Sequence, residues 1–176
     1  MAWRVRRHRS PAALGEAALR IDHIGSTSVP GLAAKDVIDV QVSVLDLDAA
    51  VALLKNAAFV PYAENTLDHS PPGMDLPAHD LEKRMVGLPA GERRTHIHLR
   101  VEGRFNQRYP LLFRDYLRTH PEAAAAIGDT KLALARHVGH DVEAYYDIKD
   151  PAYDIVMAGA TMWAVAADWR PGPSDA

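Results

Sequence analysis

Residues 22–44, DHIGSTSVPGLAAKDVIDVQVSV, restrict the fold more than any other part of this sequence. From residue 37 to residue 44 the side chains alternate in character, and a period of two predicts a β-strand with two unlike faces. One face holds Ile38, Val40, Val42 and Val44, and the other holds Val37, Asp39, Gln41 and Ser43. A glycine–serine turn and a loop of small residues precede this strand, so a phosphate could approach the backbone closely there. The stretch therefore predicts a strand that carries a carboxylate beside an anion-binding turn.

The rest of the chain predicts an α/β (α+β) fold, in which helices flank a mixed β-sheet and the C-terminal half is helical. Further strands are expected at residues 21–24, 59–62, 83–88 and 94–101. Helices are expected at residues 11–19, 47–57, 109–119, 121–138, 142–148 and 151–167, with breaks at Pro121, Gly139 and Pro151. Residues 64–80 form a loop so long that a functional or mobile segment is expected. We expect one domain over residues 1–176, with an α/β layer to about residue 104 and helices over residues 105–170.

The composition excludes several classes of protein. Hydrophobic residues make up 48% of the chain and charged residues 24%, which is ordinary for a soluble globular protein. The net charge of −3 offers no general attraction for nucleic acid, so a nucleic-acid partner is not expected. The chain has no cysteine, which rules out disulfides, thiolate nucleophiles and iron–sulfur clusters. No apolar run is long enough for a secretory signal or a membrane span, so we expect a cytoplasmic protein without a membrane partner.

The turn before the first clear strand is a candidate phosphate site. Gly25 and Ser26 begin it, and Thr27 and Ser28 add two further hydroxyl groups. Backbone N–H groups and small hydroxyl side chains are common ligands of phosphate in such turns. The alternative is a strand-to-helix turn in which a serine only caps the helix, and the sequence leaves both readings open.

Asp39 and Gln41 lie two residues apart on one face of the predicted strand. Two carboxylates in that arrangement could coordinate Mg²⁺ and align a nucleophile with a phosphoryl group. This chain has only one carboxylate there, and Gln41 would be a neutral ligand through its amide oxygen. We therefore predict a weakened Mg²⁺ site at Asp39 and Gln41, with a carboxylate hydrogen-bonded at the sheet face as the alternative.

His96 and His98 share one face of the second clear strand. Together with Asp39 they could form a metal site of two histidines and one carboxylate. They could equally donate hydrogen bonds to phosphate oxygens, or act as acid and base. Arg94 and Arg100 lie on the same face, so anion binding is the favoured interpretation, and a solvated polar face is the alternative.

Several cations further along the chain are candidates for phosphate contacts. Arg114 and Arg118 are four residues apart on a predicted helix, and two guanidinium groups could grip one phosphate. Pairing with Asp115 within the helix is the alternative. Lys35, Lys131 and Lys149 are further candidates.

The aromatic residues near the C-terminus are interpreted as packing between the last two predicted helices. The residues concerned are Tyr145, Tyr146, Tyr153, Trp163 and Trp169. On this interpretation they do not form a platform for stacking bases.

The motifs resemble those of the GrpB family. IDHIGSTSVPGLAAKDVIDVQVSV, RRTHIHLRV, LLFRDYLRTHPEA, TKLALA and YYDIKDPAYD follow one another in that family's order, from about Trp3 to Trp169. The segments KDVIDVQV, DHSPPGMD and WAVAADW are more similar to the GrpB-type domain found fused to dephospho-CoA kinase. The resemblance implies a fold of the nucleotidyltransferase superfamily.

The same resemblance implies roles for individual residues. Gly25 and Ser26 would match the Gly-Ser turn of the superfamily, and Asp39 would match its first metal carboxylate. Gln41 stands where an active nucleotidyltransferase would carry a second acidic residue, and Glu82 could supply a third.

Three functions follow as hypotheses. The first is binding of a nucleotide or a CoA-like phosphorylated ligand, with Asp39, His96 and His98 as catalytic residues if nucleotidyl transfer occurs with Mg²⁺. The second is a non-catalytic accessory domain that assists dephospho-CoA kinase or protein folding. The third is a metal-dependent hydrolase that uses Asp39, His96 and His98.

Overall fold

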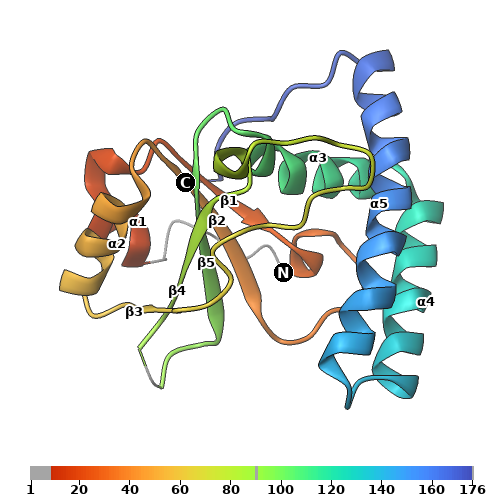
Figure 1. The fold of residues 1–176 in the computed structure, drawn as a ribbon, viewed down its shortest axis with the longest axis horizontal. Helices are drawn as coiled ribbons and strands as arrows, with labels where there is room; N and C mark the ends of the chain where they lie inside the picture. The colour runs from red at the N-terminus through yellow and green to blue at the C-terminus, as the bar shows by residue number, and fades with distance from the viewer. Residues whose placement is uncertain (1–8, 90, 176) are drawn as a thin grey trace.

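A mixed β-sheet of five strands forms the centre of the protein, and helices cover both of its faces (Figure 1). The computed structural model describes residues 9–89 and 91–175. In order across the sheet, the strands are β1 (Arg20–Ile24), β2 (Ile38–Val44), β5 (Thr95–Val101), β4 (Lys83–Gly87) and β3 (Val60–Pro61). Strands β2 and β5 run parallel, whereas the other neighbouring pairs are antiparallel. The predicted mixed sheet flanked by helices is therefore confirmed.

The register of the two central strands decides where the polar side chains lie. Asp39 is paired with His96, and Gln41 is paired with His98. Because side chains alternate along a strand, residues that face each other in register point to the same side of the sheet. The two polar faces predicted from the sequence therefore form a single polar surface.

The opposite surface of the sheet is the main apolar core. The side chains of Val40, Val42, Ile97 and Leu99 have no exposed surface, and they pack in one cluster with helices α1 (Arg9–Leu14) and α2 (Leu47–Asn56). Asp46 caps the N-terminus of α2, because its carboxylate accepts hydrogen bonds from two backbone N–H groups of the first turn. This core packs against β2 and β5 from one side.

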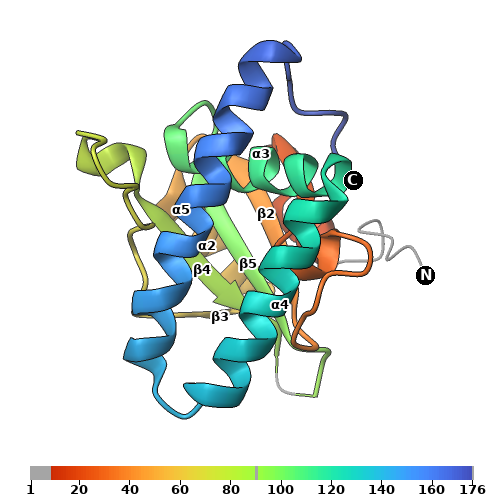
Figure 2. The same cartoon turned by 90° about the vertical axis from the view of Figure 1, so that its right-hand side faces the viewer.

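Three helices cover the polar surface: α3 (Phe105–Thr119), α4 (Pro121–His137) and α5 (Val142–Ala166). Figure 2 shows α4 and α5 side by side in front of the sheet. A second apolar cluster, which includes Leu111, Leu112, Met157 and Ala160, joins α3 to α5. Within residues 9–89 and 91–175, no helix combines the length and the apolar character needed to cross a bilayer.

Several predicted boundaries are wrong. Residues 142–166 form one helix that contains Pro151, although a break was expected there. Proline removes one backbone hydrogen bond, but this proline is exposed, and packing of Met157 and Ala160 against α3 stabilises the helix beyond it. Helix α3 begins at Phe105 and contains Pro110, and α1 ends at Leu14 before a short 3₁₀ turn. The basic start of the chain falls largely on residues 1–8, outside the described residues.

Candidate functional site

A cleft of about 810 Å³ lies between the polar surface of the sheet and helices α3, α4 and α5. Strands β2 and β5 form its floor, and the loop before β4 contributes to one wall. The predicted site residues that line it are Gly25, Ser26, Thr27, Lys35, Asp39, His96, His98, Arg114, Lys131 and Lys149. Residues from five separate parts of the sequence therefore meet at one place.

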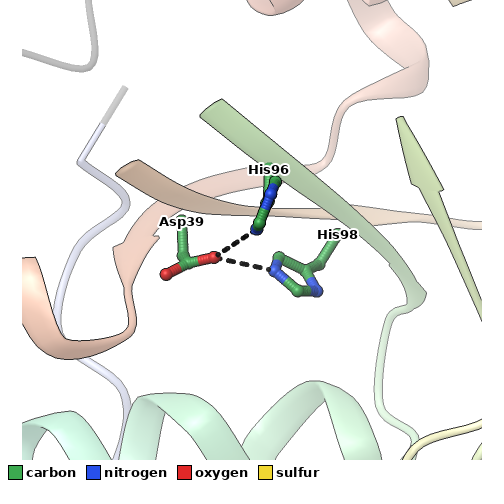
Figure 3. Close-up of side chains that lie close together, drawn as sticks. All are labelled: Asp39, His96 and His98. Atoms are coloured by element: carbon green, nitrogen blue, oxygen red, sulfur yellow. Dashed lines mark hydrogen bonds and ion pairs between the residues drawn. The ribbon is translucent and has the colours of Figure 1, made fainter. Parts of the chain in front are cut away.

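Asp39, His96 and His98 form a compact group on the floor of the cleft (Figure 3). Asp39 Oδ1 lies 3.4 Å from Nδ1 of His96 and 3.2 Å from Nε2 of His98. Asp39 comes from β2 and both imidazoles come from β5, so the parallel register brings them together. Among the described residues, this is the one group of three side chains with the spacing of a metal site.

The surroundings of Asp39 and His98 lower the pKa of each group. Burial raises the pKa of Asp39, but the hydrogen bonds with His96 and His98 lower it more, so the pKa lies well below its ordinary value. Burial lowers the pKa of His98, and the nearby Arg100 lowers it further, although Asp39 partly opposes this. At neutral pH the floor of the cleft therefore carries an ionised carboxylate beside a neutral His98.

Lys131 joins α4 to the Gly-Ser turn. Its Nζ atom donates hydrogen bonds to Ser26 Oγ and to the backbone carbonyl of Ala33. Burial lowers the pKa of Lys131 to about 8, and the ammonium groups of Lys149 and Lys35 lower it too, whereas Asp39 raises it. A lysine that loses hydration and has cationic neighbours gains from any anion that enters the cleft.

Two further lysines border the cleft beside tyrosine rings. Lys35 Nζ lies 5.2 Å from the centre of the Tyr145 ring, and Lys149 Nζ lies 4.3 Å from that of Tyr153. Lys149 also contacts Tyr146 in the same way. Three ammonium groups and three tyrosine rings thus line the side of the cleft formed by the loop before β2 and by α4 and α5.

Gly25 allows the carboxylate of Asp39 to lie against the turn. Its φ of 69° and ψ of −171° belong to a region that essentially only glycine adopts. A Cβ atom at this position would lie 2.5 Å from Asp39 Oδ2, which is shorter than any normal contact. The position of the Asp39 carboxylate therefore depends on the absence of a side chain at residue 25.

Gln41 lies outside the cleft, contrary to the role predicted for it. Its side chain is fully buried, with Nε2 donating to the carbonyl of Gln107 at 2.8 Å. Its Oε1 accepts a hydrogen bond of 2.8 Å from Nη1 of Arg100. Both ends of the amide form hydrogen bonds within the protein, so Gln41 does not fit the role of a metal ligand. Of the predicted pair, only Asp39 lies on the floor of the cleft.

Ser28 and Arg118 support the Gly-Ser turn from behind. Ser28 is buried and donates from Oγ to the carbonyl of Gly25 at 2.6 Å. Arg118 donates from Nε and Nη2 to the carbonyl of Ser28, at 3.0 and 2.8 Å. Neither residue lines the cleft, so the predicted contact of each with a ligand is not supported. Both residues instead stabilise the turn through hydrogen bonds.

Arg114 reaches the cleft but is already held by the protein. Its guanidinium donates to the carbonyl of His23 at 3.0 Å and to the carboxylates of Asp115 and Asp175, at 2.8 and 3.3 Å. The predicted pairing of Asp115 with Arg118 is present at 3.7 Å. These contacts tie α3 to β1 and to the C-terminal tail.

Asp68, in the long loop, lines the cleft although the sequence did not identify it as a site residue. Its carboxylate accepts hydrogen bonds from Nε and Nη2 of Arg100, from Lys83 Nζ and from Asn106 Nδ2, at 2.7 to 3.0 Å. Burial raises the pKa of Asp68, but Arg100 and Lys83 outweigh this and lower it strongly. The one sequence signal was Arg100, since an inward-facing arginine on a strand needs an acidic partner.

Two smaller predictions are also corrected. Glu82 pairs with Arg104 at 3.2 Å and does not line the cleft, so it supplies no third carboxylate there. The aromatic residues divide into two groups: Trp163 packs against Tyr116 of α3, and Trp169 packs in the α3–α5 cluster. The three tyrosines face the cleft, where one of them stacks on Phe113.

Comparisons with known proteins place the chain in a family. A model of the GrpB protein family matches residues 1–158. A dephospho-CoA kinase of Mycolicibacterium paratuberculosis is 34% identical over 93% of this chain and 44% of its own length, so the chain spans less than half of that relative. A UPF0157 protein of Streptomyces coelicolor is 34% identical over 86% of this chain and 72% of its own length.

A solved structure agrees with these sequence relatives. The crystal structure of the conserved protein GrpB from Enterococcus faecalis superposes with a TM-score of 0.65, at 28% identity and over 87% of both chains. The shared fold and the extent of the family match lead to one conclusion. The chain belongs to the GrpB family.

Proposed function

We propose that the cleft binds a nucleotide or another phosphorylated small molecule. The observation that carries this proposal is the convergence of Lys35, Lys131, Lys149 and the Gly-Ser turn on one cavity. Ammonium groups and the hydroxyl of Ser26 are ordinary ligands of phosphate oxygens, and Lys131 already directs its ammonium group at Ser26 Oγ and at the carbonyl of Ala33. The phosphate groups of the ligand would lie beside Lys131.

The size and the lining of the cleft support a ligand of nucleotide size. Its volume of about 810 Å³ lies within the usual range for small-molecule sites. Tyr145, Tyr146 and Tyr153 offer ring surfaces against which a base or a pantetheine chain could pack. Dephospho-CoA and CoA join the nucleotides as candidate ligands, because relatives of this chain include proteins named dephospho-CoA kinase.

Nucleotidyl transfer is a separate question from binding. A nucleotidyltransferase of the usual kind would need carboxylate oxygens around Mg²⁺. Here the floor offers one carboxylate and two imidazoles, and Gln41 is engaged elsewhere. The donor set does not suit Mg²⁺, so nucleotidyl transfer stays a prediction. Hydrolysis with another metal ion also stays a prediction, and the proposal is restricted to binding.

Replacing Lys131 with methionine is expected to weaken binding of the best ligand by about 10- to 100-fold, because a charge-assisted hydrogen bond is worth about 1.5–3 kcal/mol. A thermal-shift screen of ATP, ADP, CoA and dephospho-CoA would identify that ligand, and calorimetry would give the two affinities. Lys55→Met is the matched control, since Lys55 is an exposed lysine of α2 on the other side of the sheet. Equal affinities in the wild type and Lys131→Met would contradict the proposal.

Binding is also expected to weaken as the pH rises above about 8. The pKa of Lys131 in the free protein is about 8, and only the protonated form attracts phosphate. A bound phosphate raises that pKa, so between the free and bound values the affinity falls by up to about tenfold for each pH unit. Calorimetry with ADP from pH 7 to 9.5 would measure the slope. Lys131→Arg should flatten it, and an unchanged slope in that variant would assign the titration to another group.

A role as an accessory domain of dephospho-CoA kinase is the second candidate. The observation that favours it is the 34% identity to a dephospho-CoA kinase over 93% of this chain. The chain should then raise the refolding yield of the kinase portion of such a relative when the two are mixed. An unchanged yield, compared with an equal amount of serum albumin, would count against this role.

A further inference from the structure

The floor of the proposed ligand cleft has the geometry of a metal site. Asp39, His96 and His98 each offer one donor atom, and these atoms all lie within 4.8 Å of one another. The two separations measured from Asp39 Oδ1 are 3.4 and 3.2 Å. Donor atoms about 2.0–2.1 Å from one tetrahedral ion are about 3.3 Å apart, so one ion could contact all three side chains with small adjustments.

The three side chains are held in place before any ion arrives. They project from the two central strands, whose backbones are hydrogen-bonded to each other in parallel register. Oδ2 of Asp39 lies where a Cβ atom at residue 25 would clash with it, whereas Oδ1 faces both imidazoles. Such a fixed set loses little conformational entropy when it binds an ion.

The site is also open to the cleft. The exposed fractions of the side chains are 26% for Asp39, 25% for His96 and 14% for His98. All three line the cavity, so water or a ligand oxygen could occupy the remaining coordination position. Three protein ligands with one open position are typical of reactive zinc sites and not of purely structural ones.

We infer that Asp39, His96 and His98 bind one divalent transition-metal ion of the Zn²⁺ class, and that this ion replaces the Mg²⁺ expected from the sequence. Imidazole nitrogens favour Zn²⁺, Co²⁺ and Ni²⁺, whereas Mg²⁺ prefers oxygen ligands. The inference deepens the proposed function, because a doubly charged ion beside one carboxylate leaves a positive centre that faces the same ligand as Lys131. The metal site itself forms from protein side chains alone and can be tested without that ligand.

The test is a titration of the full chain with Co²⁺ after treatment with EDTA, without nucleotide. We expect one Co²⁺ ion to bind per chain and to give the visible absorption bands of low-symmetry coordination. Zn²⁺ added in an amount equal to the Co²⁺ should displace it and remove these bands. Mg²⁺ in large excess should leave the bands unchanged. Absence of the bands, or their removal by Mg²⁺, would overturn the inference.

Three variants assign the site. His96→Gln, His98→Gln and Asp39→Asn should each weaken Co²⁺ binding by about 100-fold or more, because loss of a direct ligand costs more than the roughly 10- to 100-fold loss typical of outer-shell partners. His137→Gln is the control, since it removes an exposed imidazole from α4. Near-ultraviolet circular dichroism should show that each variant is folded. Equal loss in His137→Gln would assign the ion to surface histidines and overturn the inference.

The two proposals can fail separately. A protein that shows nucleotide binding but no Co²⁺ bands would overturn the metal site alone. A protein that binds Co²⁺ with the expected variant pattern but none of the phosphorylated ligands would retain the metal site and lose the proposed function.

Discussion

Replacing Asp68 with alanine is expected to lower the free energy of unfolding by about 3–5 kcal/mol, which would be the largest effect of any single polar residue discussed. The side chain is only 18% exposed, and it accepts hydrogen bonds from Arg100, Lys83 and Asn106. The variant leaves Arg100, whose side chain is 6% exposed, without its carboxylate partner. A buried charge without a partner costs far more than a lost surface ion pair. Urea unfolding would measure the loss.

Two controls make this prediction specific. Asp75→Ala removes an exposed carboxylate from the same loop and should change stability by less than about 0.5 kcal/mol. Adding Arg100→Met to Asp68→Ala should recover part of the loss, because no buried charge then remains unpaired. A loss below about 1 kcal/mol for Asp68→Ala would show that the loop does not hold this network in solution.

The stabilisation from Asp68 should also depend on pH in a defined direction. Its pKa is lowered in the folded protein, so the contribution is complete above the unfolded pKa of about 3.9 and declines as the pH falls below it. The difference in stability between the wild type and Asp68→Ala should therefore shrink below about pH 4.

Replacing Gly25 with alanine is expected to cost at least about 2 kcal/mol of stability and to move Asp39 away from the imidazoles. The backbone of Gly25 lies in a region that costs other residues about 1–3 kcal/mol. In addition, the new Cβ atom would lie 2.5 Å from Asp39 Oδ2 and 3.0 Å from its Cβ and Cγ atoms. The carboxylate must therefore shift, and the contacts of Asp39 with His96 and His98 should be lost together with Co²⁺ binding.

Gly31→Ala is the matched comparison for this variant. Gly31 also has a positive φ, of 77°, but an added Cβ atom meets nothing within 4 Å. Gly31→Ala therefore reports the cost of a positive φ without a close contact, and loss of Co²⁺ binding in Gly25→Ala alone reports the close approach to Asp39. Equal losses in unfolding experiments, with Co²⁺ binding retained in both variants, would show that Gly25 does not position the carboxylate.

Local periodicity explains why part of the site could be predicted from the sequence. In β2 and β5 the alternation of side chains assigns Asp39, His96 and His98 to polar faces, and the two faces meet because the strands are neighbours in the sheet. The Gly-Ser turn could be recognised because its small residues follow each other directly. The polar face of each strand and the Gly-Ser turn need no knowledge of distant parts of the chain, whereas the pairing of β2 with β5 does.

The remaining features depend on contacts between distant residues. Gln41 lies on the same polar face as Asp39, but α3 covers it, and only the packing of Gln107 and Arg100 reveals that its amide is engaged. Asp68 lies in a loop with no periodicity, so its position against β5 could not be read from local pattern. Pro151 predicted a helix end because proline removes a backbone hydrogen bond. The packing of α5 against α3, which stabilises the helix beyond Pro151, involves residues distant in the sequence.

A crystal structure of the protein with Co²⁺ and the phosphorylated ligand that gives the largest thermal shift would test the central claim most directly. Anomalous scattering at the cobalt edge should place one ion between Asp39, His96 and His98. A phosphate group should lie within hydrogen-bond distance of Lys131 Nζ and the Gly-Ser turn, in the same cleft. A ligand bound elsewhere, such as in the groove between residues 29–33 and α4, would contradict the account.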